Sequence, residues 1–231
     1  MFGLLLATRN THKVSEIRAI LKDRFVCRSL EDFPNAPEVV EDAGTFGGNA
    51  TKKSIALARC LAASDAGSTG KAERLVLADD SGLEVDALQG APGVHSARFA
   101  ALDTGKIGNS SDAENRLKLL RLLGDVPLER RTARFRCVLA LTPVMDSPSQ
   151  NASPVCYANE LEMATQLFEG ECRGRIILEA RGSGGFGYDP LFVPEGHSRT
   201  FAELPQAVKN ELSHRARALA RLKEYLTANF R

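Results

Sequence analysis

The chain has 231 residues, of which 43% are hydrophobic and 26% are charged, which is enough for one substantial core of an ordinary globular protein. Its 30 basic and 29 acidic residues give a net charge of +1, so we expect no nucleic-acid and no membrane partner, and any anion site must be local. The five cysteines form no CxxC pair, and the apolar run in MFGLLLATRN is too short for a signal peptide or a membrane span. We therefore expect a cytoplasmic protein.

Hydrophobic periodicity divides the first 130 residues into alternating strands and helices. Short apolar runs without alternation are typical of buried strands, whereas apolar residues recurring every three or four positions predict helices. Asn10 or Thr11 is placed to cap the first helix, and Ser111 or Asp112 the third. The expected elements are a strand at 2–7, a helix at 11–23, a second strand, loop and helix unit over 27–63 with its helix at 49–63, a turn at 64–73, a strand at 74–78, a short strand or hairpin at 83–88, and a helix at 110–125.

The pattern changes after residue 130, where strands predominate. Three stretches indicate strands, and two helical segments within 198–230 close the chain. We predict an α/β fold with a mixed sheet, as a single domain over 1–231 in which one lobe comprises 1–130 plus the C-terminal helix and a second comprises 131–205. The three expected strands lie at 132–144, 153–165 and 173–182, and a polar loop is expected at 145–153.

Two adjacent carboxylates, Asp79 and Asp80, follow the strand expected at 74–78. An unpaired carboxylate buried inside a strand is costly, so we expect the strand to stop at this pair. In open α/β sheets, ligands bind at the carboxyl ends of strands. Neighbouring residues of an extended segment point to opposite faces, so only one of the two can face a bound metal, and the residues alone leave open which.

The stretch TRNTHK (8–13) lies between the first strand and the first helix. Backbone N–H groups at a helix start can hold phosphate oxygens, with Lys13 as a counter-charge. A plain helix cap explains the same residues, because Asn and Thr favour that position without any ligand.

A second polar stretch, EDAGTFGGNATKK (41–53), brings acids close to a glycine-rich helix start. Glu41 or Asp42 could hold Mg²⁺, which usually takes one or two protein carboxylates, while Lys52 or Lys53 holds phosphate. A solvated acidic loop with exposed lysines is the alternative interpretation.

The stretch GSGGFGYDP (182–190) has four glycines in its first six residues. Such a loop can approach a flat base closely, and Phe186 or Tyr188 could stack on it. A tight structural turn explains the glycines equally well.

Three basic residues, Lys209, His214 and Arg215, lie near the start of the last helical segment. They could surround a phosphate or bind carbonyl oxygens on a base edge. A solvated basic helix face is the alternative.

Five stretches, taken in order, closely resemble the inosine triphosphate pyrophosphatase family. They are LLLATRNTHKVSEI, EDAGTFGGNATKK, LADDSGLEVDALQGAPGVHSARF, GSGGFGYDPLF and FAELPQAVKNELSHRARAL, and they span residues 4 to about 220. The resemblance implies hydrolysis of non-standard purine nucleoside triphosphates (ITP, dITP, XTP) to the monophosphate and pyrophosphate with Mg²⁺. It also implies two lobes around an elongated central mixed β-sheet with flanking helices, a nucleotide in the cleft between the lobes, and usually a homodimer.

The resemblance also implies roles for individual residues. Asp80 matches the catalytic acid/base and metal ligand, which leaves Asp79 for a supporting role. Glu41 matches a common acidic position and is the second expected metal ligand. The implied substrate-binding residues are Thr8, Arg9, Asn10, Thr11, His12, Lys13, Lys53, Ser81, Phe186, Gly187, Tyr188, Asp189, Lys209, His214 and Arg215.

Two positions depart from the family pattern. Gly48 stands where the family usually has a glutamate that can bind magnesium, and Ala43 stands where the family favours glycine. We therefore expect either weaker Mg²⁺ affinity or ligation through Glu41 and Asp80.

Two other functions remain open at this point. One is a pyrophosphatase for a different modified nucleotide, such as a modified pyrimidine or a methylated guanine triphosphate. The other is a catalytically weak nucleotide-binding protein, which the Gly48 departure keeps open. A site that selects purines with a 6-oxo group needs hydrogen-bond donors that face this oxygen. The candidate donors are His214, Arg215 and backbone N–H groups of 184–189.

Overall fold

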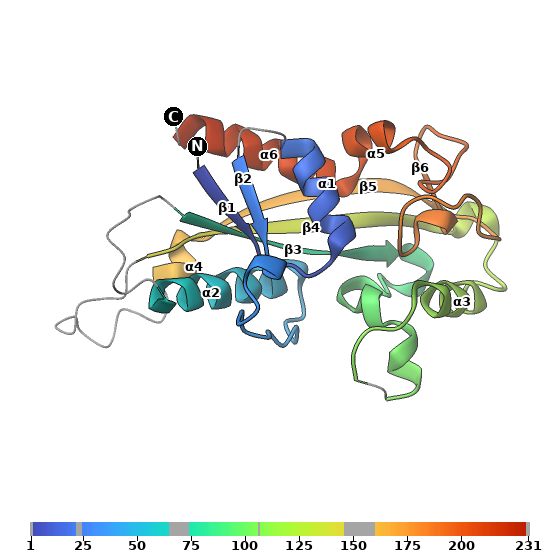
Figure 1. The fold of residues 1–231 in the computed structure, drawn as a ribbon. Helices are drawn as coiled ribbons and strands as arrows, with labels where there is room; N and C mark the ends of the chain where they lie inside the picture. The colour runs from blue at the N-terminus through green and yellow to red at the C-terminus, as the bar shows by residue number, and fades with distance from the viewer. Residues whose placement is uncertain (1, 22–24, 65–73, 106, 146–159, 230–231) are drawn as a thin grey trace. The chain divides into compact units, whose positions relative to one another are not determined.

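A computed structural model describes residues 2–21, 25–64, 74–105, 107–145 and 160–229 (Figure 1). Six strands form one mixed sheet in the order β2-β1-β3-β4-β5-β6. β1 pairs in parallel with both β2 and β3, whereas β5 and β6 are antiparallel. Helices flank the sheet, which confirms the predicted α/β class.

The strands and helices have the following bounds. The strands are β1 (Phe2–Leu6), β2 (Phe25–Ser29), β3 (Arg74–Val85), β4 (Thr132–Pro143), β5 (Gln166–Ile176) and β6 (Phe192–Pro194). The helices are α1 (Thr11–Leu21), α2 (Phe46–Ser64), α3 (Asp112–Leu122), α4 (Glu160–Ala164), α5 (Gln206–Leu212) and α6 (His214–Asn229).

The residues group into two compact units. The first contains residues 1–80, 138–168 and 219–231, and the second contains 81–137 and 169–218. β3, β4 and β5 each contribute residues to both units, because these long strands continue from one into the other. The bounds of the units thus differ from the lobes expected at 1–130 and 131–205.

In the first unit, successive residues of β3 alternate between the two faces of the sheet. Val76 and Ala78 pack in one hydrophobic cluster with Leu57 and Leu61 of α2. The residues between and beside them point to the opposite face, the side on which Figure 1 shows α1. Each face of this part of the sheet is therefore covered by its own helix.

The second unit has its own aromatic core. The ring centroids of Phe135 and Phe192 lie 4.7 Å apart in an edge-to-face arrangement, and those of Phe192 and Phe201 lie 5.2 Å apart. Leu119 of α3 and Leu191 are fully buried in the same cluster. This core supports α3 and the segment that precedes β6.

Most of the predicted elements are confirmed. β1, α1, α2, the start of β3, α3, β4 and two C-terminal helices lie where expected. Ser111 caps α3 and forms a capping box with Glu114. The turn expected at 64–73 and the polar loop at 145–153 lie almost wholly outside the described residues.

Three expectations about strands were wrong. β3 does not stop at the acidic pair but runs through it to Val85, so Asp79 and Asp80 lie inside a continuous strand. In the strand expected at 153–165, the described residues 160–164 form α4, consistent with the strong helix formers of its sequence ELEMA. The strand expected at 173–182 corresponds to β5, which begins earlier, at Gln166, and ends at Ile176.

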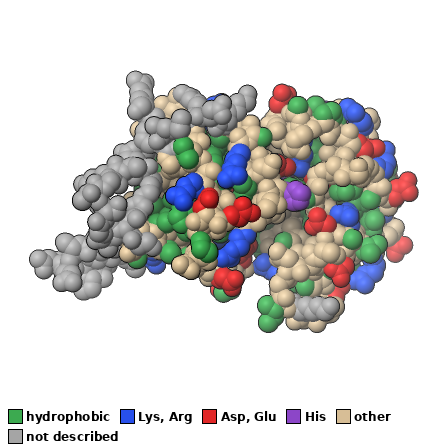
Figure 2. Space-filling view, viewed as in Figure 1, with side chains coloured by type: hydrophobic (Ala, Val, Ile, Leu, Met, Phe, Trp, Pro, Cys, Tyr) green, Lys and Arg blue, Asp and Glu red, His purple; other side chains and the backbone are tan. Residues whose placement is uncertain are grey.

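Within the described ranges, no helix is both long and apolar enough to cross a membrane. Figure 2 shows acidic and basic side chains interspersed on the visible face, in keeping with a net charge of +1.

Candidate functional site

The two consecutive acids of β3 bind different lysines. Asp79, only 2% exposed, accepts a hydrogen bond of 2.5 Å from Nζ of Lys13, which lies at the start of α1. Asp80, 6% exposed, accepts one of 2.9 Å from Lys53 Nζ of α2. The two carboxylates thus point towards different helices, as expected for neighbours in a strand. Their lysine partners offset the cost of burying two charges in the sheet.

The second carboxylate oxygen of Asp80 is held by an amide. Asn49 Nδ2 donates to Asp80 Oδ2 at 3.2 Å, and Asn49 Oδ1 accepts from the backbone N–H of Ala43 at 3.0 Å. Asn49 is completely buried. It was not among the residues predicted for the site, although a polar residue at the start of an otherwise apolar helix face was a usable signal. The amide fixes the orientation of the Asp80 carboxylate.

The ammonium group of Lys53 lies among three oxygen atoms. Its Nζ is 2.9 Å from Asp80 Oδ1 and from the carbonyl oxygen of Asp79, and 3.5 Å from Glu41 Oε1. Burial alone would lower the pKa of Lys53, but the charges of Asp80 and Glu41 outweigh it and raise the pKa. The ammonium group therefore keeps its proton and supplies a fixed positive charge beside Asp80.

Burial has the larger effect on Asp80. Desolvation raises the pKa of its carboxyl above the ordinary value, although Lys53 and Lys13 act in the opposite direction. A carboxylate with a raised pKa is a stronger base than an exposed aspartate. Asp80 is therefore suited to accept a proton.

Glu41 and Asp80, the two carboxylates expected to bind magnesium, lie beside the same lysine. Both lie within 3.5 Å of the same ammonium nitrogen, so both already face one positive charge. No group of three or more His, Cys, Asp or Glu side chains arranged for a metal occurs in the part of the chain that the structure describes. Two carboxylates suffice for Mg²⁺, which commonly completes its shell with water and substrate phosphate oxygens.

Gly48 and Ala43 lie against each other at the start of α2. A Cβ atom built on Gly48 would lie 2.8 Å from the Cβ of Ala43 and 3.1 Å from Thr45 Oγ1. The first distance is shorter than side chains tolerate, so the methyl group of Ala43 occupies the room that a side chain at position 48 needs. A side chain at position 48 and the methyl group of Ala43 therefore compete for the same space.

The loop at 8–13 forms the predicted helix cap. Asn10 Oδ1 accepts from the backbone N–H of Lys13 at 3.1 Å, and Thr8 Oγ1 accepts from the N–H of Asn10 at 3.1 Å. Arg9 donates to the carbonyl oxygen of Ala36. Residues 9–12 are exposed, and Thr8 and Lys13 are half-buried. The loop combines a cap with side chains accessible to a ligand, and its role in substrate binding stays a prediction.

In the second unit, the three basic residues near the start of α6 are buried. Arg215 is 1% exposed and donates from Nη2 to Ser81 Oγ at 2.9 Å. Lys209 is 2% exposed and donates to Asp189 Oδ2 at 2.6 Å. The His214 ring stacks on Phe135, with centroids 4.9 Å apart. These residues do not form a solvated helix face, because the second unit buries all three.

The glycine-rich loop presents one aromatic ring and buries the other. The half-buried Phe186 ring has Lys209 Nζ 5.0 Å and Arg215 Cζ 5.9 Å from its centroid. Tyr188 packs in the core, and its hydroxyl donates to the carbonyl oxygen of Ser96 at 2.9 Å. Burial raises the pKa of Tyr188 well above its ordinary value. Of the two rings considered for base stacking, only Phe186 is partly accessible.

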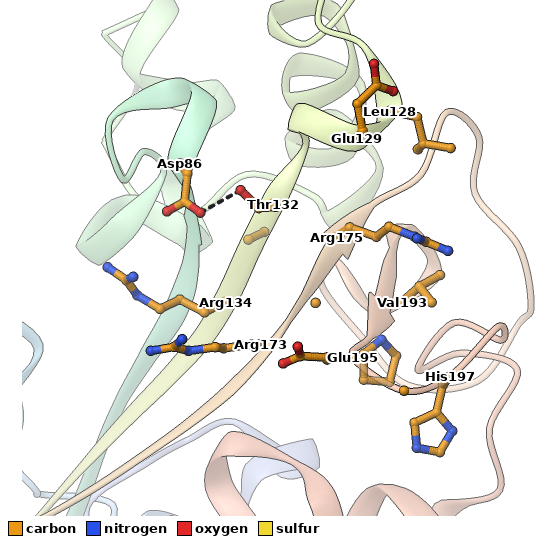
Figure 3. Close-up of a pocket in the computed structure, with 14 residues that line it drawn as sticks. Asp86, Leu128, Glu129, Thr132, Arg134, Arg173, Arg175, Val193, Glu195 and His197 are labelled. Atoms are coloured by element: carbon orange, nitrogen blue, oxygen red, sulfur yellow. Dashed lines mark hydrogen bonds between the residues drawn. The ribbon is translucent and has the colours of Figure 1, made fainter.

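A cavity of about 610 Å³ lies elsewhere in the second unit (Figure 3). Charged side chains of both signs line it. Among them, Arg134 donates to Glu84 at 2.6 Å, and Asp86 accepts from Thr132 at 2.7 Å. None of the residues predicted for the site lines it. Its size alone does not make it the functional site.

The comparisons with known proteins agree on one family. The Ham1 family profile matches residues 4–225. Proteins named dITP/XTP pyrophosphatase from Geobacter sulfurreducens and Shouchella clausii are 47% and 43% identical to this chain. The first alignment covers 98% of this chain and 97% of the relative, and the second covers 97% and 96%.

Solved structures extend the agreement to the fold. The Staphylococcus aureus Ham1 protein superposes with a TM-score of 0.73 at 32% identity, covering 98% of each chain. The nucleoside-triphosphatase, dITP/XTP pyrophosphatase, from Mycobacterium abscessus superposes with a TM-score of 0.65 at 36% identity, covering 96% of this chain and 98% of the other. By profile, sequence and fold together, the chain belongs to the Ham1 family.

Proposed function

We propose that the protein hydrolyses non-standard purine nucleoside triphosphates, namely ITP, dITP and XTP, to the nucleoside monophosphate and pyrophosphate. This proposal rests on the environment of Asp80. Its buried carboxylate is fixed by Lys53 and Asn49, and Glu41 lies beside the same Lys53 ammonium group. Relatives named dITP/XTP pyrophosphatase, at 40–47% identity over nearly the whole chain, support it.

Asp80 serves as the base in this proposal. Its carboxylate takes a proton from the attacking water as the new bond to the α-phosphorus forms. The bond between the α-phosphorus and the bridging oxygen breaks, and pyrophosphate leaves with the electron pair. The Lys53 ammonium, held 2.9 Å from Asp80, opposes the negative charge that grows on the phosphates. The raised pKa of Asp80 brings its basicity closer to that needed at neutral pH.

Glu41 and Asp80 are the residues that would hold Mg²⁺. When bound, the ion would acidify water and neutralise phosphate oxygens, which an aspartate alone does poorly because free water is a very weak acid. The gathering of these two carboxylates around one ammonium nitrogen supports the assignment.

Residues of the second unit are proposed to recognise the base and sugar. Phe186 is the ring for stacking, and Arg215 and His214 are the donors for a 6-oxo group. A site whose donors require an oxygen at this position disfavours ATP, which presents an amino group there. Ser81 and the loop at 8–13 are proposed as further substrate contacts.

The proposal extends to the assembly and location of the protein. We infer a cytoplasmic homodimer, supported by the resemblance to a family whose members are usually dimeric. Light scattering of the purified protein tests the dimer, and fractionation of cells tests the location.

A panel of nucleotides, assayed for pyrophosphate release with and without Mg²⁺, tests the function. We expect ITP, dITP and XTP to be cleaved with much higher kcat/KM than ATP or GTP, and only with the metal present. Equal kcat/KM for ATP and ITP would contradict the proposal. Preference for a modified pyrimidine or methylated guanine triphosphate would indicate a different substrate class. Tight ITP binding without turnover would indicate a binding protein.

A further inference from the structure

The first turns of α3 hold one residue of the glycine-rich loop from both sides. The backbone N–H of Gly187 donates to Asp112 Oδ2 at 2.6 Å, and Arg116 Nη1 donates to the carbonyl oxygen of Gly187 at 2.7 Å. Asp112 and Arg116 are four residues apart, so they project from the same face of the helix. The N–H and the carbonyl belong to successive peptide groups, so both peptides flanking the Gly187 Cα are fixed.

The loop conformation at this point requires glycine. Gly187 has φ +62° and Gly185 has φ +70°, in the left-handed region that side chains disfavour. Phe186 lies between them, and its N–H donates to Asp189 Oδ2 at 3.0 Å. Two glycines in the left-handed region thus flank the half-buried Phe186 ring, and two hydrogen bonds from α3 restrict Gly187.

α3 is a firm support for these contacts. Its N-terminus has the capping box of Ser111 and Glu114. Asn115 accepts from the N–H of Ala100 at 2.8 Å and donates to the carbonyl oxygen of Ala97 at 3.2 Å. Further along the helix, Leu119 is fully buried in the aromatic core. A helix fixed at both its cap and its core face can transmit its position to the loop.

We propose that Asp112 and Arg116 are positioning residues for nucleotide binding. They act through Gly187 on Phe186, holding its ring beside Lys209 and Arg215, and do not themselves touch the substrate. The inference rests on the proposed function, because it assigns the Phe186 loop to the base of the nucleotide.

The test compares four single variants with the wild-type enzyme. Asp112→Ala removes the acceptor of the Gly187 N–H, and Asp112→Asn keeps an acceptor oxygen at the same place. Arg116→Ala removes the donor to the Gly187 carbonyl. Leu117→Ala is the matched control, because Leu117 lies on the same helix, is 68% exposed and has no side-chain group that could hydrogen-bond to the loop.

Two measurements are made on each variant. Hydrogen exchange of the Gly187 amide, followed by NMR, reports the anchoring of the loop without any substrate. Steady-state kinetics with ITP and Mg²⁺ separate KM from kcat, since a positioning role in binding raises KM, whereas damage to the reacting groups lowers kcat.

For Asp112→Ala we expect faster exchange of Gly187 and a KM raised roughly three- to tenfold, as for the loss of one loop hydrogen bond, with kcat nearly unchanged. Asp112→Asn should restore both quantities towards wild type. Arg116→Ala should raise KM by a similar factor. In the double variant Asp112→Ala/Arg116→Ala, KM should rise by less than the product of the two single increases, because both contacts fix the same residue.

Three results would overturn the inference: unchanged KM in both Asp112→Ala and Arg116→Ala, failure of Asp112→Asn to restore KM, or an equal rise of KM in Leu117→Ala. Failure of the proposed function gives a different result, namely no ITP turnover by the wild-type enzyme. In that case the same comparison is made on the dissociation constant for ITP measured by calorimetry. A wild-type protein that does not bind ITP would overturn both.

Discussion

Asp79 and Asp80 are consecutive in β3, yet their carboxylates bind lysines from two different helices, Lys13 of α1 and Lys53 of α2. The pair is therefore not a dyad sharing one proton. Each acid has its own environment, and the two should respond differently to the same substitution.

Asp80→Asn should lower kcat by at least about a hundredfold, because an amide cannot act as the base. The fold should persist, since an asparagine has the same shape and its one remaining acceptor oxygen can still accept from Lys53, although its NH2 group cannot accept from Asn49. Asp79→Asn should leave most of the turnover but lower the free energy of unfolding by about 2 kcal/mol, because the ammonium of Lys13 loses its charged partner. Pyrophosphate release and urea unfolding of both variants check this. Normal turnover by Asp80→Asn would remove the proposed base.

Gly48→Ala should destabilise the protein, although alanine is usually the better helix residue. The new methyl group would lie 2.8 Å from the Cβ of Ala43, and overpacking of this kind costs about 1–3 kcal/mol. Ala43→Gly in the same chain should remove most of that cost. Urea unfolding of the two single variants and the double variant measures the coupling. Strictly additive effects would show that the contact is not responsible.

The same pair of positions offers a test of the metal site. Ala43→Gly combined with Gly48→Glu places an additional carboxylate in the first turn of α2, near Glu41. We expect this variant to reach half-maximal activity at a lower Mg²⁺ concentration than wild type. The control is Ala43→Gly with Gly48→Gln, which has the same shape without the charge. An equal shift in both variants would mean that charge at position 48 does not act on the metal.

The two rings of the glycine-rich loop should have separable effects. Phe186→Ala should raise KM for ITP roughly tenfold or more, since loss of stacking on a base commonly costs about 1–3 kcal/mol, with little change in stability. Tyr188→Phe should lower the free energy of unfolding by about 1 kcal/mol through loss of the hydrogen bond to Ser96, with KM unchanged. Kinetics and urea unfolding of both variants decide the matter, and a raised KM in Tyr188→Phe would contradict the assignment.

Cys172 should make the protein sensitive to alkaline pH. Burial raises the pKa of its thiol to about 11, whereas in the unfolded chain the thiol ionises at an ordinary, lower pH. Between those two values the unfolded chain loses the proton that the folded chain keeps, so the thiol's contribution to stability is full at neutral pH and falls as pH rises. The slope should approach about 1.4 kcal/mol per pH unit in this window. Cys172→Ala should lack this part of the slope in urea unfolding from pH 8 to 11, and parallel pH dependence in the two proteins would argue against it.

Local sequence signals predicted the elements that depend on local chemistry. The cap of α1 at Asn10 and the capping box at Ser111 were readable from residues within one turn. The strong helix formers of 160–164 were equally local, but they were read as part of a strand extending from 153.

Features that depend on distant partners were not readable. Asp79 and Asp80 are tolerated inside a strand because two lysines, 66 and 27 residues away in the sequence, neutralise them. The residues next to the pair do not indicate that these lysines lie nearby. The contact between Gly48 and Ala43 is local in sequence, yet only three-dimensional packing shows that the two substitutions belong together. The burial of Tyr188 likewise depends on Ser96, at a separation of 92 residues.

Because β3 continues through its acidic pair, the number of residues in this strand determines the direction in which Asp80 points. Along an extended chain the side-chain direction reverses at every residue, so one residue inserted or deleted between Arg74 and Asp79 would turn Asp80 away from Lys53 and bring its neighbour into that place. Substitutions at the apolar positions of β3 leave this alternation of side-chain directions unchanged. The residues that make up β3 should therefore be more tolerant of change than the number of residues that precede the Asp80 carboxylate.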